Sequence, residues 1–181
     1  MKVQEIFSHI HLNLIESYST KLPLKWLNTP TGKGATFEIG EEKYYIEINV
    51  YNMPLVTRQK PLEVYEVSFK RMLVIPTVVQ TPSKHFSQVF GVVYNGILEV
   101  IHKDQPDIVF FSAKFKNDKG DTEIFDKRVR IYSQLASRAA MHGIYNKLQE
   151  PLRSKHALNF VLIQHEINIT KDEIEWIKEH I

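Results

Sequence analysis

Residues 107–115 read Asp-Ile-Val-Phe-Phe-Ser-Ala-Lys-Phe, a short and almost continuous apolar run. Polar turns bound this run, with Gln105-Pro106 before it and Lys116 to Asp121 after it. A short apolar run between turns is typical of a β-strand that is covered on both faces. We therefore expect a buried strand here, with helices packed over it.

Helical patterns lie on both sides of this strand in the sequence. Before it, apolar residues recur with a helical period up to Lys103, behind Ser83 as the N-cap. After it, Asp126 to His142 carries a second apolar stripe, and Gly143 is the residue expected to end that helix. These patterns predict two core helices, and their apolar positions are Phe86, Phe90, Val93, Ile97 and Ile101 in the first and Val129, Tyr132, Leu135 and Ala139 in the second.

Residues 35–80 predict an antiparallel meander. Thr36 to Ile39 and Lys43 to Tyr51 alternate between polar and apolar residues across a short turn that contains Gly40, which favours a β-hairpin. Glu63 to Met72 alternates in the same way and predicts a third strand. Residues 21–33 hold two prolines and Trp26, and we expect a connecting loop whose tryptophan either covers the core or serves in recognition.

The two ends of the chain are predicted to be helical. Apolar residues between positions 3 and 18 have the spacing of one helical face, so we expect a helix over residues 1–20. Thr170 and Glu173 form a capping box for a last helix over residues 170–181, after an apolar strand from Leu158 to Gln164. Residues 83–165 thus form an α/β half, and the whole chain, 1–181, is expected to be a single α+β domain with a mixed, mostly antiparallel sheet flanked by helices.

Composition restricts the chemistry. The chain of 181 residues has no cysteine, which excludes disulfides, thiolate zinc sites, iron–sulfur clusters and thiol catalysis. Its eight histidines are scattered without the spacing of a metal motif, so we expect no metal site. It also lacks a nucleophile elbow, a P-loop and a dinucleotide fingerprint. The longest apolar stretch free of charge is shorter than the about 20 residues of a membrane span, so we expect a soluble, cytoplasmic protein without a membrane partner.

The predicted order is helix, three antiparallel strands, helix, buried strand, helix and strand, and the segment from Arg130-Ile131-Tyr132 to Gly143 is a Tyr-containing helix that ends at glycine. This order resembles the core of the GNAT acyltransferase superfamily. The resemblance implies a GNAT-like fold, and it implies acyl-coenzyme A bound by backbone N–H groups at the start of the helix after the meander. The residues at that place are Gln80, Ser83, Lys84 and His85.

This segment departs from the GNAT pattern, because both of the expected glycine positions carry other residues and Pro82 has no N–H to donate. The alternative is a plain capped helix start. Tyr132 would stand where the family often places the acid that protonates the leaving thiolate, but it also continues the apolar stripe of its helix. The residues leave both alternatives open.

Shorter matches resemble a group of uncharacterised proteins encoded by tailed phages. They are Val89-Phe90, Gln105-Pro106-Asp107, Phe111-Ser112-Ala113 and the segment from Arg128 to Tyr132. They lie within about a third of the chain. This resemblance implies a phage source and an accessory role, and it carries no established activity.

Charge is unevenly spread behind a net value of +2. Residues 127–156 hold seven basic residues against Glu150 alone, a net +6, whereas residues 166–181 carry a net −3. Such a basic segment can bind phosphates, nucleic acid or an acidic protein. The alternative is a solvated face that the terminal helix neutralises. The candidate partner-binding residues are Lys127, Arg128, Arg130, Arg138, Arg153 and Lys155.

Three functional hypotheses follow. The leading one is a non-catalytic phage-type accessory protein that needs no cofactor and binds a host or viral macromolecule, most simply a protein, in the host cytoplasm. The second is an acyl-coenzyme A-dependent N-acyltransferase with a degenerate pyrophosphate loop. The third is a binder of phosphate-rich ligands or nucleic acid.

Overall fold

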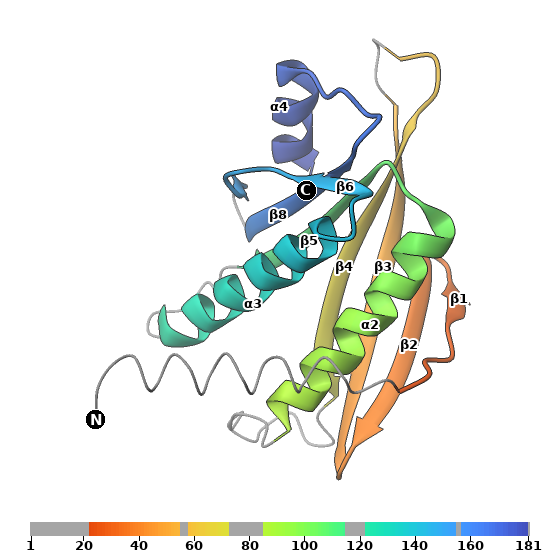
Figure 1. Ribbon diagram of the computed structural model, residues 1–181, viewed down its shortest axis with the longest axis vertical. Coiled ribbons are helices and arrows are strands. Elements are labelled where there is room, and N and C mark those ends of the chain that lie inside the picture. Colours follow the sequence, from red (N-terminus) through yellow and green to blue (C-terminus); the bar gives the residue numbers. More distant parts are fainter. Residues whose placement is uncertain (1–21, 55–57, 73–84, 115–121, 155–156, 181) are drawn as a thin grey trace. The chain divides into compact units, whose positions relative to one another are not determined.

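The computed structural model describes residues 22–54, 58–72, 85–114, 122–154 and 157–180. The predicted helix over residues 1–20 lies outside this range, as does the segment after Met72. In the described part, three helices and eight strands follow one another along the chain (Figure 1). They are β1 (Leu27–Thr29), β2 (Gly32–Ile39), β3 (Glu42–Met53), β4 (Leu62–Met72), α2 (Phe86–Asp104), β5 (Ile108–Lys114), α3 (Thr122–Ala140), β6 (Tyr145–Lys147), β7 (Leu152–Arg153), β8 (Ala157–Gln164) and α4 (Lys171–His180).

The strands belong to one sheet with the order β1-β2-β3-β4-β5-β8-β6, and β7 also pairs with β8. β4 and β5 run parallel, with four paired positions from Val64↔Ile108 to Val67↔Phe111. β8 is antiparallel to β5, β6 and β7. The predicted α+β class with a mixed, mostly antiparallel sheet is therefore confirmed.

The chain divides into two compact units, which are described separately. The first consists of Met1–Thr29, Lys33–Glu47 and Phe69–Lys103, and the second of Pro30–Gly32, Ile48–Ser68 and Asp104–Ile181. None of the helices in the described part of the chain is long and apolar enough to cross a membrane.

The first unit contains the predicted hairpin. Gly40 takes a φ of 60° in the turn between β2 and β3, a conformation that glycine adopts without steric cost. Alternate residues of β3 are buried as the pattern predicts, among them Tyr44 and Ile46. A Cβ added to Gly40 would lie 3.0 Å from Nε2 of His85, so this imidazole packs closely against the hairpin turn.

Trp26 covers part of this unit. Its side chain and that of Leu24 lie against Gly96 of α2, where a larger residue would collide with Leu24. The indole nitrogen is buried and has no hydrogen-bond partner among the described residues. Of the two interpretations of Trp26, the structure therefore favours a cover for the core.

The expected loop over residues 21–33 is wrong in part, because it contains β1 and the start of β2. The backbone N–H of Val50 donates to the carbonyl oxygen of Thr31 at 2.7 Å, so the turn between these strands is itself tied to β3. The two prolines and the glycine of this segment predicted a loop. The short strand in it is defined by its pairing with another strand and not by a pattern of its own.

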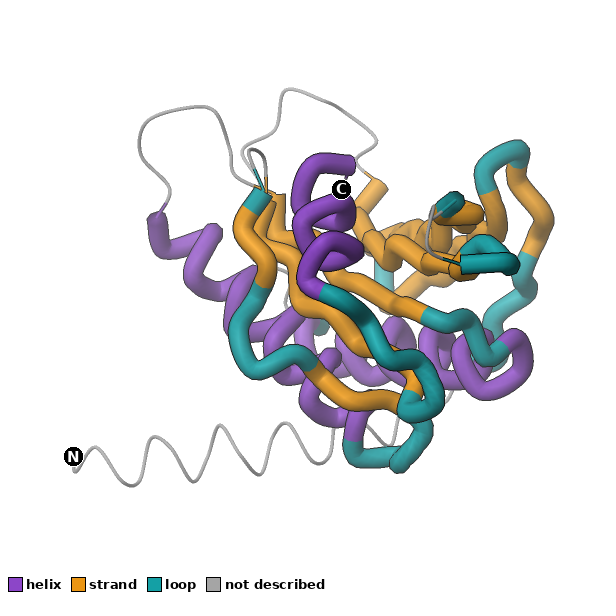
Figure 2. Tube along the Cα trace, turned by 90° about the horizontal axis from the view of Figure 1, so that it is seen from above, coloured by secondary structure: helices purple, strands orange, loops and turns teal. Residues whose placement is uncertain are grey.

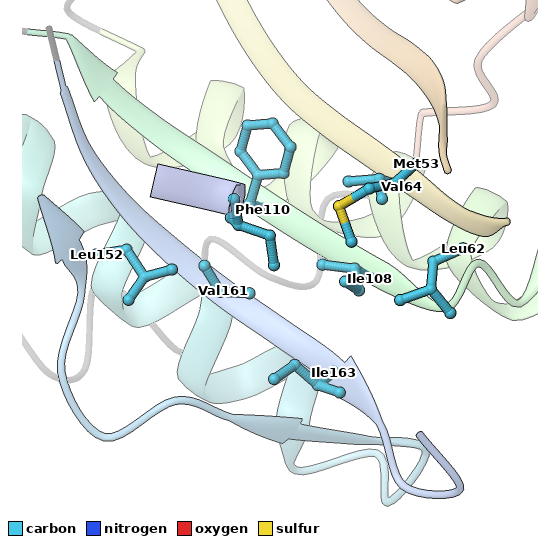
Figure 3. Close-up of a cluster of buried hydrophobic side chains, with 9 residues drawn as sticks. Met53, Leu62, Val64, Ile108, Phe110, Leu152, Val161 and Ile163 are labelled. Atoms are coloured by element: carbon cyan, nitrogen blue, oxygen red, sulfur yellow. The ribbon is translucent and has the colours of Figure 1, made fainter. Parts of the chain in front are cut away.

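The core of the second unit is built on β5, which is buried on both faces as predicted. On one face, the ring of Phe111 stacks on Tyr132 of α3 with centroids 6.4 Å apart. On the other, Phe110 belongs to a cluster of apolar side chains (Figure 3), which also includes Ile177 of α4. α3 and α4 therefore cover opposite faces of the strands in this unit (Figure 2). The cluster consists of Met53, Leu62, Val64, Ile108, Phe110, Leu152, Val161, Ile163 and Ile177.

The predicted capping box starts α4. The N–H of Thr170 donates to Glu173 Oε2 at 2.9 Å, and the N–H of Glu173 donates to Thr170 Oγ1 at 3.3 Å. Arg58, from the connection between β3 and β4, donates to both carboxylate oxygens of Glu173 at 2.6 and 2.9 Å. These hydrogen bonds raise the pKa of the Arg58 guanidinium. A planar two-point contact thus fixes the first turn of α4.

The chain turns sharply between α2 and β5, where Gln105 takes a φ of 50°. Tyr65 donates its hydroxyl to Asp104 Oδ2 at 3.0 Å, and Tyr145 donates its hydroxyl to the carbonyl oxygen of Pro106 at 2.8 Å. Both rings are buried, and burial raises the pKa of each hydroxyl well above the usual value near 10. Two neutral tyrosines thereby hold this turn.

Replacing Arg58 by alanine is expected to destabilise the protein. Glu173 is 2% exposed, and its carboxylate would lose its two strongest donors while remaining buried. We expect the free energy of unfolding in urea to fall by about 2 kcal/mol. Lys178→Ala removes the solvent-exposed pair with Glu175 on the same helix and should cost less than about 0.5 kcal/mol. Equal losses in the two variants would contradict this account.

Tyr65 should make the stability of the protein depend on pH only in the alkaline range. Below the usual tyrosine pKa of about 10 the hydroxyl is neutral in both the folded and the unfolded chain. Above it the unfolded chain releases the proton while the folded chain keeps it, so the free energy of unfolding falls as pH rises. The test is to measure the free energy of unfolding in urea for the wild type and for Tyr65→Phe as the pH rises through this alkaline range, since phenylalanine cannot ionise. Parallel curves for the two proteins would refute it.

Candidate functional site: a basic strip on the second unit

The structure places the predicted partner-binding residues that it describes on two elements of the second unit. Arg130 and Arg138 lie on α3, and Arg153 lies on β7. Lys127 and Arg128 belong to the first half of α3, but their side chains lie outside the described part, as does the whole of Lys155. The candidate site can therefore be assessed from the arginines of α3 and β7.

α3 is amphipathic, with one stripe packed on β5 and β8 and a polar stripe facing solvent. Arg130 and Ser137 are exposed, and Ser133 is half-buried. Positions 130, 133 and 137 share one helical face because they are spaced by about one and two turns. The packed stripe consists of Tyr132, Leu135, Ala136 and Ala139.

Lys147 of β6 lies against this polar stripe. Its ammonium donates to Ser137 Oγ at 2.8 Å and to Ser133 Oγ at 3.3 Å, and it lies 6.0 Å from the ring centroid of Phe160. Two hydroxyls and an aromatic ring stabilise the charge without cancelling it. Lys147 thus presents a positioned positive charge beside α3.

The strand register places Arg153 on the same side of the sheet. Lys147 is the partner of Leu162 and Arg153 is the partner of Leu158, both on β8. Directly paired residues of antiparallel strands share a face, and residues an even number apart on one strand also share a face. Lys147 and Arg153 therefore follow the same side of β8, about 13 Å apart. We call Arg130, Lys147 and Arg153 the basic strip.

Arg138 does not belong to this strip. It lies about 80° around the helix from Arg130 and on the far flank from Ser133. Its side chain is half-buried, whereas that of Arg130 is exposed. The sequence grouped these two arginines together, but the geometry of the helix places them on different flanks.

Sequence reasoning missed Lys147 as a site residue, although it contributed to the charge of the basic segment. Nothing in the residues 144–154 predicted β6, whose pairing with β8 brings Lys147 to α3. A usable signal was present in the pair of serines one turn apart on the polar stripe of the predicted helix. Small hydroxyl residues at that spacing leave room for a long side chain from a neighbouring element.

The residues predicted for an acyl-coenzyme A site lie partly outside the described part of the chain. Gln80, Ser83 and Lys84 lie outside the described residues, and His85 packs against the β2–β3 turn. Tyr132 is 7% exposed and stacks on Phe111, which fits its place in the apolar stripe of α3. Within the described part of the chain, no group of three or more His, Asp or Glu side chains is placed to hold a metal ion.

Comparison of the chain with family models, with curated proteins and with solved structures finds no match in any of the three.

Proposed function

We propose that this protein is a phage-type accessory protein with a GNAT-like core, and that it works without catalysis by binding an acidic segment of a host or viral protein in the host cytoplasm. The observation that carries the proposal is the contact of Lys147 with Ser133 and Ser137. Among the described residues, this ammonium is held by hydroxyls and not by a carboxylate, so its charge remains available to a partner.

The spacing of the strip favours an extended partner. Arg130 is exposed on the same helical face as the two serines, and Arg153 follows Lys147 along β8. Positive charges along one side of β8 and on the adjoining face of α3 match carboxylates arranged along a chain. Complementary charge of this kind mainly sets partner choice and the rate of association.

A protein partner is preferred to a nucleic acid on the chemistry of the strip. Single strands are bound by aromatic rings on which bases stack, between basic residues. The aromatic ring beside Lys147 is Phe160, which is 4% exposed and is not available for stacking. The strip thus offers charge and hydroxyl groups, which suit carboxylates.

Charge reversal on the strip should weaken binding to an acidic peptide. We expect Arg130→Glu combined with Lys147→Glu to weaken binding of a fluorescent glutamate-rich peptide at least about tenfold, because like charges then face each other. Fluorescence anisotropy at several salt concentrations measures the effect. Lys25→Glu changes an exposed lysine of the first unit and serves as the matched control, which should bind as the wild type does.

Two outcomes would count against this assignment. Equal weakening by Lys25→Glu would show that net charge alone matters. Tighter binding of an oligonucleotide with the same charge as the peptide, with a steep salt dependence, would favour the nucleic-acid alternative.

A second candidate function is acyl-coenzyme A binding. It is favoured by the element order, in which a β2–β4 meander leads through α2 to β5, a parallel neighbour of β4. A GNAT-type cofactor would meet the chain at residues 80–85, directly before α2, and Lys84 would meet its phosphates. Tyr132 would then require access that its burial at 7% exposure does not provide. This supports cofactor binding without transfer more than an active acyltransferase.

Calorimetry with acetyl-coenzyme A tests the second candidate. If the cofactor binds before α2, Lys84→Ala should weaken it several-fold by removing a phosphate contact. Lys103→Ala changes an exposed lysine at the other end of α2 and should leave the affinity unchanged. Absence of heat at millimolar acetyl-coenzyme A would exclude the cofactor.

A further inference from the structure

A small pocket opens beside α4, on the face of the second unit opposite to α3. Its floor consists of Met53, Val64, Phe110 and Ile177, each no more than 3% exposed. Its rim consists of Tyr51, Glu66 and Trp176. The cavity volume is about 110 Å³. Pockets for drug-sized ligands have roughly 300–1,000 Å³, so this one fits a single head group.

The rim combines aromatic rings with one carboxylate. Tyr51 and Trp176 rise from β3 and α4, and Phe110 closes the base from β5. Glu66 on β4 is held in place, because its Oε2 accepts from the hydroxyl of Tyr51 at 2.8 Å and from Nδ2 of Asn49 at 3.2 Å. A pocket lining that combines three aromatic side chains with a fixed carboxylate favours an organic cation.

The count of acceptors restricts the kind of cation. A primary ammonium brings three N–H donors, and each needs an acceptor when it leaves water. Glu66 Oε2 already accepts two hydrogen bonds, so Oε1 is the carboxylate oxygen left to accept from the three donors of an ammonium, and the floor of the pocket is apolar. A quaternary ammonium has no N–H to satisfy, and its methyl groups gain from apolar and aromatic contact.

We propose that this pocket binds a trimethylammonium group, as carried by choline or by a trimethylated lysine side chain. Glu66 supplies the charge, the rings of Tyr51 and Trp176 supply the cation–π faces, and Phe110 forms the base. The pocket lies on the other face of the sheet from the basic strip, so the proposal is independent of the acidic partner proposed above.

Choline and its uncharged analogue 3,3-dimethyl-1-butanol provide the test, since they share a shape and differ in charge. We expect choline to bind the full chain saturably and at least about tenfold more tightly than the alcohol, as followed by ligand-detected NMR. A trimethyllysine amide is titrated in parallel with unmodified lysine amide, and only the methylated form should bind. The tighter of choline and trimethyllysine identifies the source of the group.

Matched variants locate the effect. Glu66→Gln keeps the shape of the side chain and should reduce the affinity for choline to that for the alcohol. Tyr51→Leu, at a position that is 47% exposed, should weaken choline about fivefold without unfolding the protein. Glu175→Gln removes an exposed carboxylate next to Trp176 in the sequence and should have no effect. Equal affinity for choline and the alcohol, no saturable binding of either, or equal loss in Glu175→Gln would overturn the proposal.

Discussion

A strand that is buried on both faces imposes strict conditions on the elements around it, and β5 is such a strand. Residues from Ile108 to Phe111 are each no more than 1% exposed. Because its side chains alternate between faces, α3 must cover one set and α4 the other. Its backbone must also be paired along both edges, and β4 and β8 provide this. The second unit is the arrangement that satisfies these conditions.

A polar pair within this apolar layer fixes its register. Ser112 donates to Oδ1 of Asn159 at 2.6 Å between directly paired positions of β5 and β8. A slip by one residue would turn every side chain of β8 to the other face and separate these two groups. The cost is visible at Nδ2 of Asn159, which is buried without a partner among the described residues. An apolar pair would avoid that cost, but it would specify the register less strictly.

The sequence predicted the elements whose periodicity is local. The patterns predicted α2, α3, α4, β5 and β8 to within a few residues of their ends. Each of these segments has an apolar pattern long enough to show which of its residues are buried. β1, β6 and β7 have two or three residues and no pattern of their own, so only their pairing partners define them. Contacts between residues that are far apart in the sequence could not be predicted from local patterns either, and the contact of Arg58 with Glu173 is the clearest case.

The candidate site was predicted only in part for the same reason. The charge of Arg130 and Arg153 was evident, but β6 was needed to place Lys147.

Burial of β5 also decides where the second unit can present polar chemistry. The centre of its sheet is covered by α3 and α4, so the polar side chains of its described strands reach solvent at the margins of the two helices. On the α3 side that margin is formed by β6 and β7, which carry Lys147 and Arg153. On the α4 side it is formed by β3 and β4, which carry Tyr51 and Glu66. One margin is cationic with hydroxyl groups, whereas the other combines a carboxylate with aromatic rings. The two faces therefore present charges of opposite sign, and a net charge of +2 for the whole chain conceals this division.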